Sequence, residues 1–288
     1  MQYLGGIVMF SIVLTIHDKE FLLERVIQGL IRNTVGEFEI IYVVDGCSDR
    51  SLDVVEKRVR RQDKILVTPN LFETKANNVG CKAANGDFIA IIQDDQIVNE
   101  YSWNLRMLQP FAFGDIYGVT SGAAHNWSLN PHPSANSMTR DGWSDLLRTQ
   151  NKADKSNTRR DRFEIRASGN RGPLILDHST LRDLNYFDEL YAPQDMDDHD
   201  LAFRARANLG KFIGCYWVDV YSRNEWGGTR ADGGPAQWLL KANRDNSERF
   251  VNRWSQAISD TENIGESRIL KSSPYFKNFL KRKLGVHI

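Results

Sequence analysis

The sequence predicts an α/β protein with a doubly wound, mostly parallel sheet and helices on both of its faces. Short runs of consecutive apolar residues, such as Phe88–Ile92, are typical of strands buried on both faces of a parallel sheet. These runs alternate with segments in which apolar residues recur at helical spacing, as between Phe21 and Ile31. Such alternation predicts parallel strands joined by right-handed crossovers. The helical pattern after Pro235 adds C-terminal helices.

The first half of the chain alternates regularly between the two patterns. We expect strands and helices, in chain order, at Phe10–Thr15, Phe21–Ile31, Phe38–Val44, Leu52–Val59, Ile65–Val67, Thr74–Ala84, Phe88–Ile92, Trp103–Leu108 and Ile116–Thr120. Parallel strands share one carboxyl edge, where ligands bind in open α/β sheets. Asp45 and the pair Asp94-Asp95 follow two of these strands, so we expect them at one edge. A solvated turn is the alternative for the pair taken alone.

Composition limits the class of partner. The 288 residues carry a formal net charge of +0, with a pI of about 7.0. Nucleic-acid-binding domains are usually basic, so we expect no nucleic-acid partner. Three cysteines without metal-type spacing indicate a reducing compartment, and we expect a cytoplasmic protein. The apolar stretch Gly5–Ile16 is too short to span a bilayer and lacks a basic leading region, so we interpret it as an approach to the first strand.

The common nucleotide and metal motifs are absent. The first strand is not followed by G-x-G-x-x-G, and G-x-x-x-x-G-K-[ST], H-E-x-x-H and C-x-x-C do not occur. A nucleotide bound at the acidic edge would therefore have its diphosphate neutralised by a metal at Asp95 rather than by a glycine-rich loop. Mg²⁺ or Mn²⁺ suits carboxylate, water and phosphate oxygens.

The second half is less regular. Residues 125–172 are polar and irregular in pattern, and Arg140–Arg171 holds nine Arg or Lys against five Asp or Glu. We expect a mobile loop on the acceptor side that favours an anionic acceptor, with a solvated charged face as the alternative. A strand at Gly172–Leu176, a helix at Ser179–Leu184 and a strand at Trp217–Tyr221 follow the loop.

An acidic run opens a further helix in this half. Asp195, Asp197, Asp198 and Asp200 precede an apolar helical face that ends at Gly210. Acidic residues at a helix N-terminus complement the helix dipole, which is the purely structural interpretation. We expect His199 to lie on the exposed surface of this helix.

Several pieces of the chain, taken in order, resemble the family 2 glycosyltransferases with the GT-A fold. The pieces are Ser11–Asp18, Val43–Asp49, Lys75–Gly80 with Gly86-Asp87, the D-x-D-like Gln93-Asp94-Asp95, and Asp197–Leu201, which matches E-D-x-D-L and is followed by Arg204 and Gly210. The resemblance extends from about residue 10 to residue 225. Three features depart from the family pattern: Gln93 stands for the first aspartate, Asp197 stands for the usual glutamate, and no histidine follows the strand at Trp217–Tyr221.

The resemblance implies roles for individual residues. Asp198 would be the catalytic base, with Asp197 beside it, and Asp95 would bind the Mn²⁺ or Mg²⁺ that bridges the diphosphate. The implied nucleotide-binding residues are Thr15, His17, Asp18, Asp45, Lys75, Asn78 and Asp94. A solvated helix lysine is the alternative for Lys75. A base and a leaving-group clamp on opposite sides of the sugar imply one displacement with inversion.

Two further segments suggest contacts outside these motifs. Trp226 could stack on a sugar and Arg230 could hold a phosphate in a lid, with a plain turn as the alternative. Near the end of the chain, an apolar stripe (Phe276, Phe279, Leu280, Leu284) lies beside Lys277, Lys281, Arg282 and Lys283. It predicts a basic helix in peripheral contact with the inner face of a membrane, with core packing as the alternative.

We expect three parts and one activity. Residues 1–122 would form the nucleotide-sugar-binding half, 123–234 the acceptor-binding and catalytic half, and 235–288 a C-terminal helical extension. The expected partners are a nucleotide-diphosphate sugar donor and a glycan or other hydroxyl acceptor. A nucleotidyltransferase is one alternative, although His17-Asp18-Lys19 is not the basic, glycine-rich loop that such an enzyme needs. A non-catalytic nucleotide-sugar or glycan-binding module on the same fold is the other.

Overall fold

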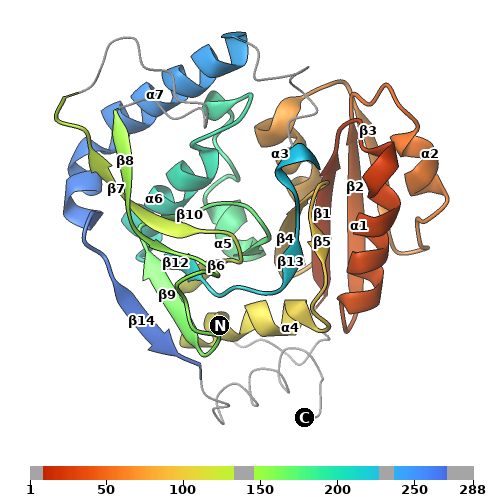
Figure 1. Cartoon of the computed structure of the whole chain (residues 1–288), viewed down its shortest axis with the longest axis horizontal. Helices are drawn as coiled ribbons and strands as arrows, with labels where there is room; N and C mark the ends of the chain where they lie inside the picture. Colours follow the sequence, from red (N-terminus) through yellow and green to blue (C-terminus); the bar gives the residue numbers. More distant parts are fainter. Residues whose placement is uncertain (1–8, 133–145, 227–236, 271–288) are drawn as a thin grey trace.

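A nine-stranded sheet forms the centre of the molecule. The computed structural model describes residues 9–132, 146–226 and 237–270, and these residues contain the sheet (Figure 1). Its strands lie in the order β14 (Glu266–Ile269), β9 (Arg162–Arg166), β12 (Phe212–Cys215), β6 (Ile116–Thr120), β11 (Leu174–Asp177), β4 (Phe88–Gln93), β1 (Phe10–Ile16), β2 (Phe38–Asp45) and β3 (Lys64–Thr68).

Most strands of this sheet run in one direction. β1 pairs in parallel with β2 and with β4, and β2 pairs in parallel with β3. Only β9 and β11 run opposite to the other seven strands of the described sheet. Thr15 lies level with Val43 of β2 and Gln93 of β4, so the carboxyl ends of these three strands meet at one edge. The predicted mostly parallel α/β class is confirmed.

Helices cover both faces of the sheet. α1 (Glu20–Asn33), α2 (Ser51–Glu56) and α4 (Trp103–Leu108) pack on one face, where Leu22, Val26 and Leu30 are fully buried against alternate residues of β1 and β2. α3 (Phe72–Ala83), α5 (His178–Asp183) and α6 (Asp197–Leu209) pack on the other face. Because the central strands β1, β2 and β4 are covered on both sides, most of their residues are apolar, without alternation.

The packing of α3 on β1 and β2 depends on a small residue. A Cβ atom at Gly80 would lie 2.4 Å from Cγ1 of Val13 and 3.0 Å from Cγ2 of Val43. The glycine therefore lets the helix approach the strands closely enough to bring the N-terminal turn of α3 beside the carboxyl edge of the sheet, where the backbone N–H of Phe72 donates to Asp45.

The segment expected to be an irregular loop contains strands, so that expectation is wrong for its described part. β7 (Ala124–Leu129), β8 (Leu147–Ala153) and β10 (Ser168–Gly169) form a three-stranded sheet, and β9 joins the central sheet. The residues 148–152 of β8 are all exposed. A polar, solvent-facing edge strand shows no apolar pattern, which is why the sequence gives no signal of it.

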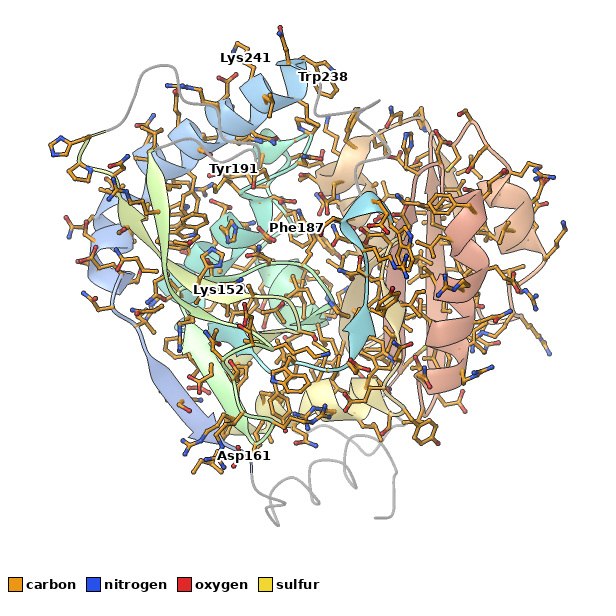
Figure 2. The ribbon with its side chains drawn as sticks, viewed as in Figure 1. Lys152, Asp161, Phe187, Tyr191, Trp238 and Lys241 are labelled. Atoms are coloured by element: carbon orange, nitrogen blue, oxygen red, sulfur yellow. The ribbon has the colours of Figure 1, made fainter. Side chains whose placement is uncertain are left out.

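The described C-terminal residues, 237–270, form one long helix and one strand. α7 (Gln237–Thr261) packs over β7 and α6 through Phe250 and Ile258, and β14 extends the central sheet. Figure 2 shows Trp238 and Lys241 on the outer end of α7, and the Trp238 ring lies 5.2 Å from that of Phe72. Strands of the central sheet therefore come from all three predicted parts.

The remaining elements are short. β5 (Ile97–Val98) pairs with β13 (Val220–Tyr221), and 3₁₀ helices cover Gln109–Phe113, Glu189–Tyr191 and Asn224–Trp226. Of the strand expected at Trp217–Tyr221, only Val220–Tyr221 is a strand, β13; β12 ends before it, at Cys215. Among the described residues, no helix has the length and apolar character needed to cross a membrane. Arg230 and the basic stripe at 276–284 lie outside the described residues.

Candidate active site

Three acidic strand ends meet at the carboxyl edge of the sheet. The Nδ1–H of His17 donates to the carbonyl oxygen of Asp45 at 2.7 Å, and the backbone N–H of His17 donates to Asp94 at 2.8 Å. His17 therefore ties the end of β1 to the ends of β2 and β4. This convergence agrees with the expectation that Asp45, Asp94 and Asp95 share one edge, because parallel strands end together there.

The carboxylate of Asp45 is enclosed by the chain itself. It is fully buried and accepts hydrogen bonds from the Thr68 hydroxyl at 2.7 Å and from the backbone N–H groups of Leu71 and Phe72 at 2.7 and 3.0 Å. These bonds hold β3 and the start of α3 against β2. Asp45 thus shapes the edge of the sheet, and its predicted contact with a base or ribose stays a prediction.

Asp18 organises the loop after β2. One oxygen accepts from the backbone N–H groups of Ser48 and Asp49 at 2.7 and 3.2 Å, and the residue itself has a left-handed φ of 49°. Asp18, Cys47 and Asp49 offer ligand atoms within 4.8 Å of one another. Burial raises the pKa of the Cys47 thiol to about 11, so a metal bound there would have to displace the thiol proton.

Asp94 and Asp95 follow β4 and have different surroundings. Asp94 lies 3.8 Å from the Lys19 ammonium, which is itself buried and donates to the carbonyl oxygen of Trp226. Oδ1 of Asp95 is buried and accepts no hydrogen bond from any described residue. Burial raises the pKa of Asp95, partly offset by the charge of Lys19. An unsatisfied carboxylate oxygen is costly and suits a divalent cation with oxygen ligands, so this residue fits the implied metal.

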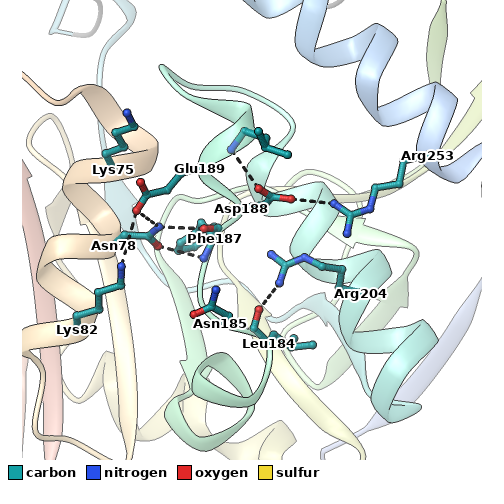
Figure 3. Close-up of a pocket in the computed structure, with 11 residues that line it drawn as sticks. Lys75, Asn78, Lys82, Leu184, Asn185, Phe187, Asp188, Glu189, Arg204 and Arg253 are labelled. Atoms are coloured by element: carbon teal, nitrogen blue, oxygen red, sulfur yellow. Dashed lines mark hydrogen bonds and ion pairs between the residues drawn. The ribbon is translucent and has the colours of Figure 1, made fainter.

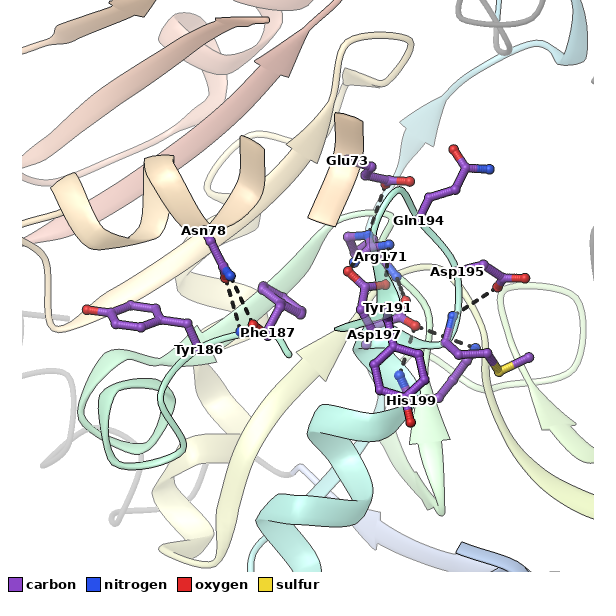
Figure 4. A network of polar contacts seen from close by, with 12 residues as sticks. Glu73, Asn78, Arg171, Tyr186, Phe187, Tyr191, Gln194, Asp195, Asp197 and His199 are labelled. Carbon is purple, nitrogen blue, oxygen red and sulfur yellow. Dashed lines mark hydrogen bonds and ion pairs between the residues drawn. The ribbon is translucent and has the colours of Figure 1, made fainter. Parts of the chain in front are cut away.

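A buried arginine connects β4 to α6. Arg171 lies between β10 and β11 and donates to both oxygens of Asp197 at 2.8 Å, and to Glu73 of α3 at 3.0 Å (Figure 4). Glu73 also accepts from the side-chain amide of Gln93 at 3.2 Å. The two-point pair holds the pKa of Asp197 below its usual range despite complete burial. Asp197 is thus a charged anchor for the first turn of α6.

Asp198 has the properties of a general base. It lies in the first turn of α6 and is 7% exposed. Burial raises its pKa to about 6; the Arg171 charge opposes this and the Asp197 charge adds to it. One oxygen accepts the backbone N–H of Arg171 at 3.2 Å and the other that of His199 at 2.9 Å. A carboxylate with a pKa near the working pH is suited to accept a proton during catalysis.

The neighbours of Asp198 differ from expectation. His199 is 2% exposed, so its predicted surface position is wrong. It packs against the rings of His125, Trp127 and Phe250, with centroids 5.1, 4.9 and 6.5 Å away, and burial lowers its pKa to about 3. The sequence could not indicate this, because the covering strand β7 has no apolar pattern.

Asp195 belongs to the acidic run, but the sequence assigns it no role of its own. It precedes α6 with a left-handed φ of 74°, and Met196 follows with 64°. Its Oδ2 is buried without a hydrogen-bond partner among the described residues. Burial, with the charges of Asp198 and Asp197, raises its pKa to about 8, so it is mostly protonated at neutral pH.

The last acid of the run has a structural role. Asp200 is fully buried and accepts from Nε of Arg204 at 2.6 Å and from the indole N–H of Trp254 at 2.8 Å. Arg204 also donates to the carbonyl oxygens of Leu184 and Tyr186 at 2.5 and 2.8 Å. This pair therefore joins α6 to α7 and to the segment after α5. The motif residues Asp198 and Asp200 point to different sides of the helix.

Lys75 and Asn78 lie away from the acidic edge. They line a cavity of about 530 Å³ that also includes Lys82, Phe187 and Arg253 (Figure 3). The side-chain amide of Asn78 donates to the carbonyl oxygen of Phe187 at 2.9 Å and accepts its N–H at 3.0 Å. The structure thus gives Asn78 a role in holding the segment before α6, and nucleotide contacts by Lys75 and Asn78 remain predictions.

Trp226 is packed rather than exposed. It is 9% exposed, and its ring lies 5.3 Å from Tyr221 and 5.5 Å from the guanidinium of Arg25 on α1. Its carbonyl oxygen accepts from the buried Lys19, which also faces Asp94. In this arrangement the Trp226 backbone lies near the acidic edge while its ring is covered by protein. Stacking of this ring on a sugar would require a different position.

Comparison with known proteins identifies the family. Residues 11–174 match the sequence model of glycosyl transferase family 2. A relative described as the uncharacterized glycosyltransferase EpsJ of Bacillus subtilis (strain 168) is 35% identical over 91 residues, 31% of this chain and 26% of the relative. The curated relatives are matched over 26% to 37% of their own lengths.

Solved structures show the same fold. The structure of GalNAc-T7 with UDP, GalNAc and Mn²⁺ gives a TM-score of 0.62 over 90% of this chain and 50% of that chain, at 14% identity. S. aureus TarS 1-349 in complex with UDP-GlcNAc gives 0.54 over 84% and 66%, at 17% identity. The predicted GT-A fold is therefore confirmed. Because the family match covers more than half of the chain, this protein belongs to glycosyl transferase family 2.

Proposed function

We propose that this protein transfers a sugar from a nucleotide-diphosphate sugar to an acceptor hydroxyl, with inversion, and that Asp198 is the general base. The observation that supports this most is the state of Asp198. A nearly buried carboxylate with a pKa raised to about 6 stands in the first turn of α6, and Arg171 links that turn to the end of β4.

The proposed chemistry divides the acids by their surroundings. Asp198 takes the proton of the attacking hydroxyl, and a positioned base contributes roughly 10²- to 10⁴-fold. Asp197 cannot share this role, because both of its oxygens bind the Arg171 guanidinium at 2.8 Å. Asp200 cannot do so either, because it is enclosed by Arg204 and Trp254.

The leaving group requires positive charge on the other side of the sugar. Asp95, with its unsatisfied Oδ1, would hold a Mn²⁺ or Mg²⁺, which supplies that charge to the departing diphosphate. Among the described residues, the buried Lys19 is the cation that faces both Asp94 and Asp95. Its ammonium lies 3.8 Å from Asp94, and its charge opposes the rise that burial causes in the pKa of Asp95.

Two structural neighbours suggest where to look for the donor. TarS was solved with UDP-GlcNAc and GalNAc-T7 with UDP, GalNAc and Mn²⁺, so uridine diphosphate sugars are the first donors to test. A thermal-shift panel of UDP, GDP, CDP and dTDP, each with and without Mn²⁺, identifies the nucleobase of the donor, because a ligand that binds the native state raises the melting temperature.

The decisive experiment compares donor turnover by the wild type and by Asp198→Asn. We expect turnover by the wild type and its loss in the variant, with the nucleotide-induced thermal shift retained. Asp219→Asn, which changes an exposed carboxylate paired with Lys155, is the matched control and should retain activity. Nucleotide binding without turnover of any donor by the wild type would favour the non-catalytic module. Full activity of Asp198→Asn would refute the assignment of the base.

A further inference from the structure

Arg171 occupies a central position between the two acidic regions. Its side chain is 6% exposed, and its guanidinium lies between the carboxylates of Glu73 and Asp197. Glu73 comes from the first turn of α3 and Asp197 is the first residue of α6. One cation therefore connects a helix beside the carboxyl edge of β4 to the helix that carries the proposed base.

The contacts of Arg171 determine the geometry of the first turn of α6. Both terminal nitrogens donate to Asp197 at 2.8 Å, a two-point arrangement that defines distance and orientation together. Its backbone N–H donates to Oδ2 of Asp198 at 3.2 Å. The chain enters this turn through Asp195 and Met196, which both have a left-handed φ, and no side chain caps the start of α6. The pair with Arg171 thus supplies the restraint that a cap would otherwise give.

We infer that Arg171 is a positioning residue that holds Asp198 in its orientation and couples it to the donor end of β4 through Glu73. This inference rests on the proposed role of Asp198 as the base. Asp198 makes the contact with the substrate. Arg171 acts on Asp198 through its two-point pair with Asp197 (the fork), through its own backbone N–H and through its charge.

The same network gives a reason for the amide at position 93. Gln93 ends β4, and its Nε2 donates to Glu73 at 3.2 Å, while Nε of Arg171 donates to the same Glu73 oxygen at 3.0 Å. A carboxylate at 93 would face that of Glu73 at this distance and compete for the single guanidinium. The neutral amide instead extends the network from α6 to the strand that leads to Asp94 and Asp95.

Several titratable groups face Asp198, and most are neutral at neutral pH. The groups are Tyr117 of β6, His199 and Asp197 of α6, Asp195 before it, His125 of β7 beside His199, and Arg171. Burial raises the pKa of Tyr117, lowers those of both histidines and raises that of Asp195 to about 8. Arg171 and Asp197 are therefore the charged neighbours that set the pH at which Asp198 loses its proton.

The test compares the pH profile of kcat in the wild type, Arg171→Gln and Arg171→Lys. For Arg171→Gln we expect kcat to fall roughly 100-fold, as for a misplaced catalytic group. The acid limb should move up by about one pH unit, because an opposite charge nearby no longer favours the carboxylate. Arg171→Lys keeps the charge but not the fork, so its acid limb should stay in place while kcat remains low.

A matched control and a second variant separate positioning from folding. Arg268→Gln removes another Arg–Asp fork, to Asp115 at the opposite end of the sheet, and should keep both kcat and the acid limb. If Arg171→Gln does not fold, the double variant Arg171→Gln/Asp197→Asn removes both buried charges. It should fold with a low kcat and a nearly unmoved acid limb, because the lost charges act on Asp198 in opposite directions.

The outcomes distinguish the two proposals. The positioning role is overturned if Arg171→Gln or the folded double variant keeps the wild-type kcat. It is also overturned if the acid limb of Arg171→Gln does not move. If that happens while Asp198→Asn is inactive, the proposed function still stands. If the wild type turns over no donor, hydrogen exchange of residues 194–203 tests the restraint directly. Faster exchange in Arg171→Gln than in the wild type and Arg268→Gln supports it, and unchanged exchange overturns it.

Discussion

The pH dependence of transfer is the sharpest test of Asp198 as the base. Burial raises the pKa of this carboxyl to about 6, so the proton is retained to a higher pH than in an exposed aspartate. A base works only in its deprotonated form, and activity should therefore fall as the pH drops through 6. Lowering the pH from 8 to 5 is the perturbation.

The size of the effect follows from the position of that pKa. The carboxylate fraction is ~0.99 at pH 8, ~0.5 at pH 6 and ~0.09 at pH 5, so kcat should fall about tenfold over the range. An exposed aspartate, with a pKa near 3.9, would lose less than about one tenth of its carboxylate form over the same range. The two cases differ enough for ordinary steady-state kinetics to separate them.

The assay measures the release of nucleoside diphosphate at saturating donor, with tryptophan fluorescence recorded to verify folding at each pH. Any residual activity of Asp198→Asn should be flat between pH 5 and 8, because the titrating group is gone. A flat wild-type profile would refute the reasoning. An acid limb that persists unchanged in Asp198→Asn would also refute it, because the titration would then belong to the donor or to another residue.

Three further predictions concern other acids of the site. The pKa of Asp195 is raised to about 8 in the folded protein, so this residue lowers the free energy of unfolding as the pH rises above the pKa of an unfolded aspartate. Between pH 5 and 7, the free energy of unfolding of Asp195→Asn should therefore fall by about 3 kcal/mol less than that of the wild type. Urea unfolding at both pH values measures this, and an equal fall in the two proteins would contradict it. Asp200→Ala leaves the buried Arg204 unpaired and should lower the free energy of unfolding by about 3–5 kcal/mol; an unchanged denaturation midpoint would argue against that role. Asp95→Asn should abolish the gain in nucleoside diphosphate affinity that Mn²⁺ provides, measured by calorimetry with and without the metal; an equal gain in the variant would exclude Asp95 as a ligand.

In the first half of the chain the sequence pattern predicts the strands correctly. The apolar runs from Phe10 to Thr120 predicted β1, β2, β3, β4 and β6, because a strand covered by helices on both sides must be apolar throughout. The irregular loop expected at 125–172 is wrong for the opposite reason. β8 exposes most of its residues, so nothing in its composition distinguishes a polar edge strand from a loop.

For the site, motif order was informative and side-chain partners were not. The positions of Asp94, Asp95 and Asp198 followed from strand ends and from the start of a helix. Arg171 and Glu73 lie 98 residues apart and belong to no motif, yet they connect these acids. The surroundings of Asp195 cannot be predicted from the acidic run, because its left-handed backbone and its unsatisfied oxygen appear only when the surrounding elements are in place.

The amino-acid sequence by itself determined the α/β class, the family and the acids available for chemistry, because these depend on local apolar patterns and on the order of short motifs. Tertiary structure alone decided what each acid does. Asp197, Asp198 and Asp200 lie within one turn of α6, and each is a carboxylate at the same end of the same helix. One is anchored by Arg171, one has its pKa raised by burial, and one is enclosed by Arg204 and Trp254. The free energy of a carboxylate depends on the charges and donors within a few ångströms, and those come from distant parts of the chain.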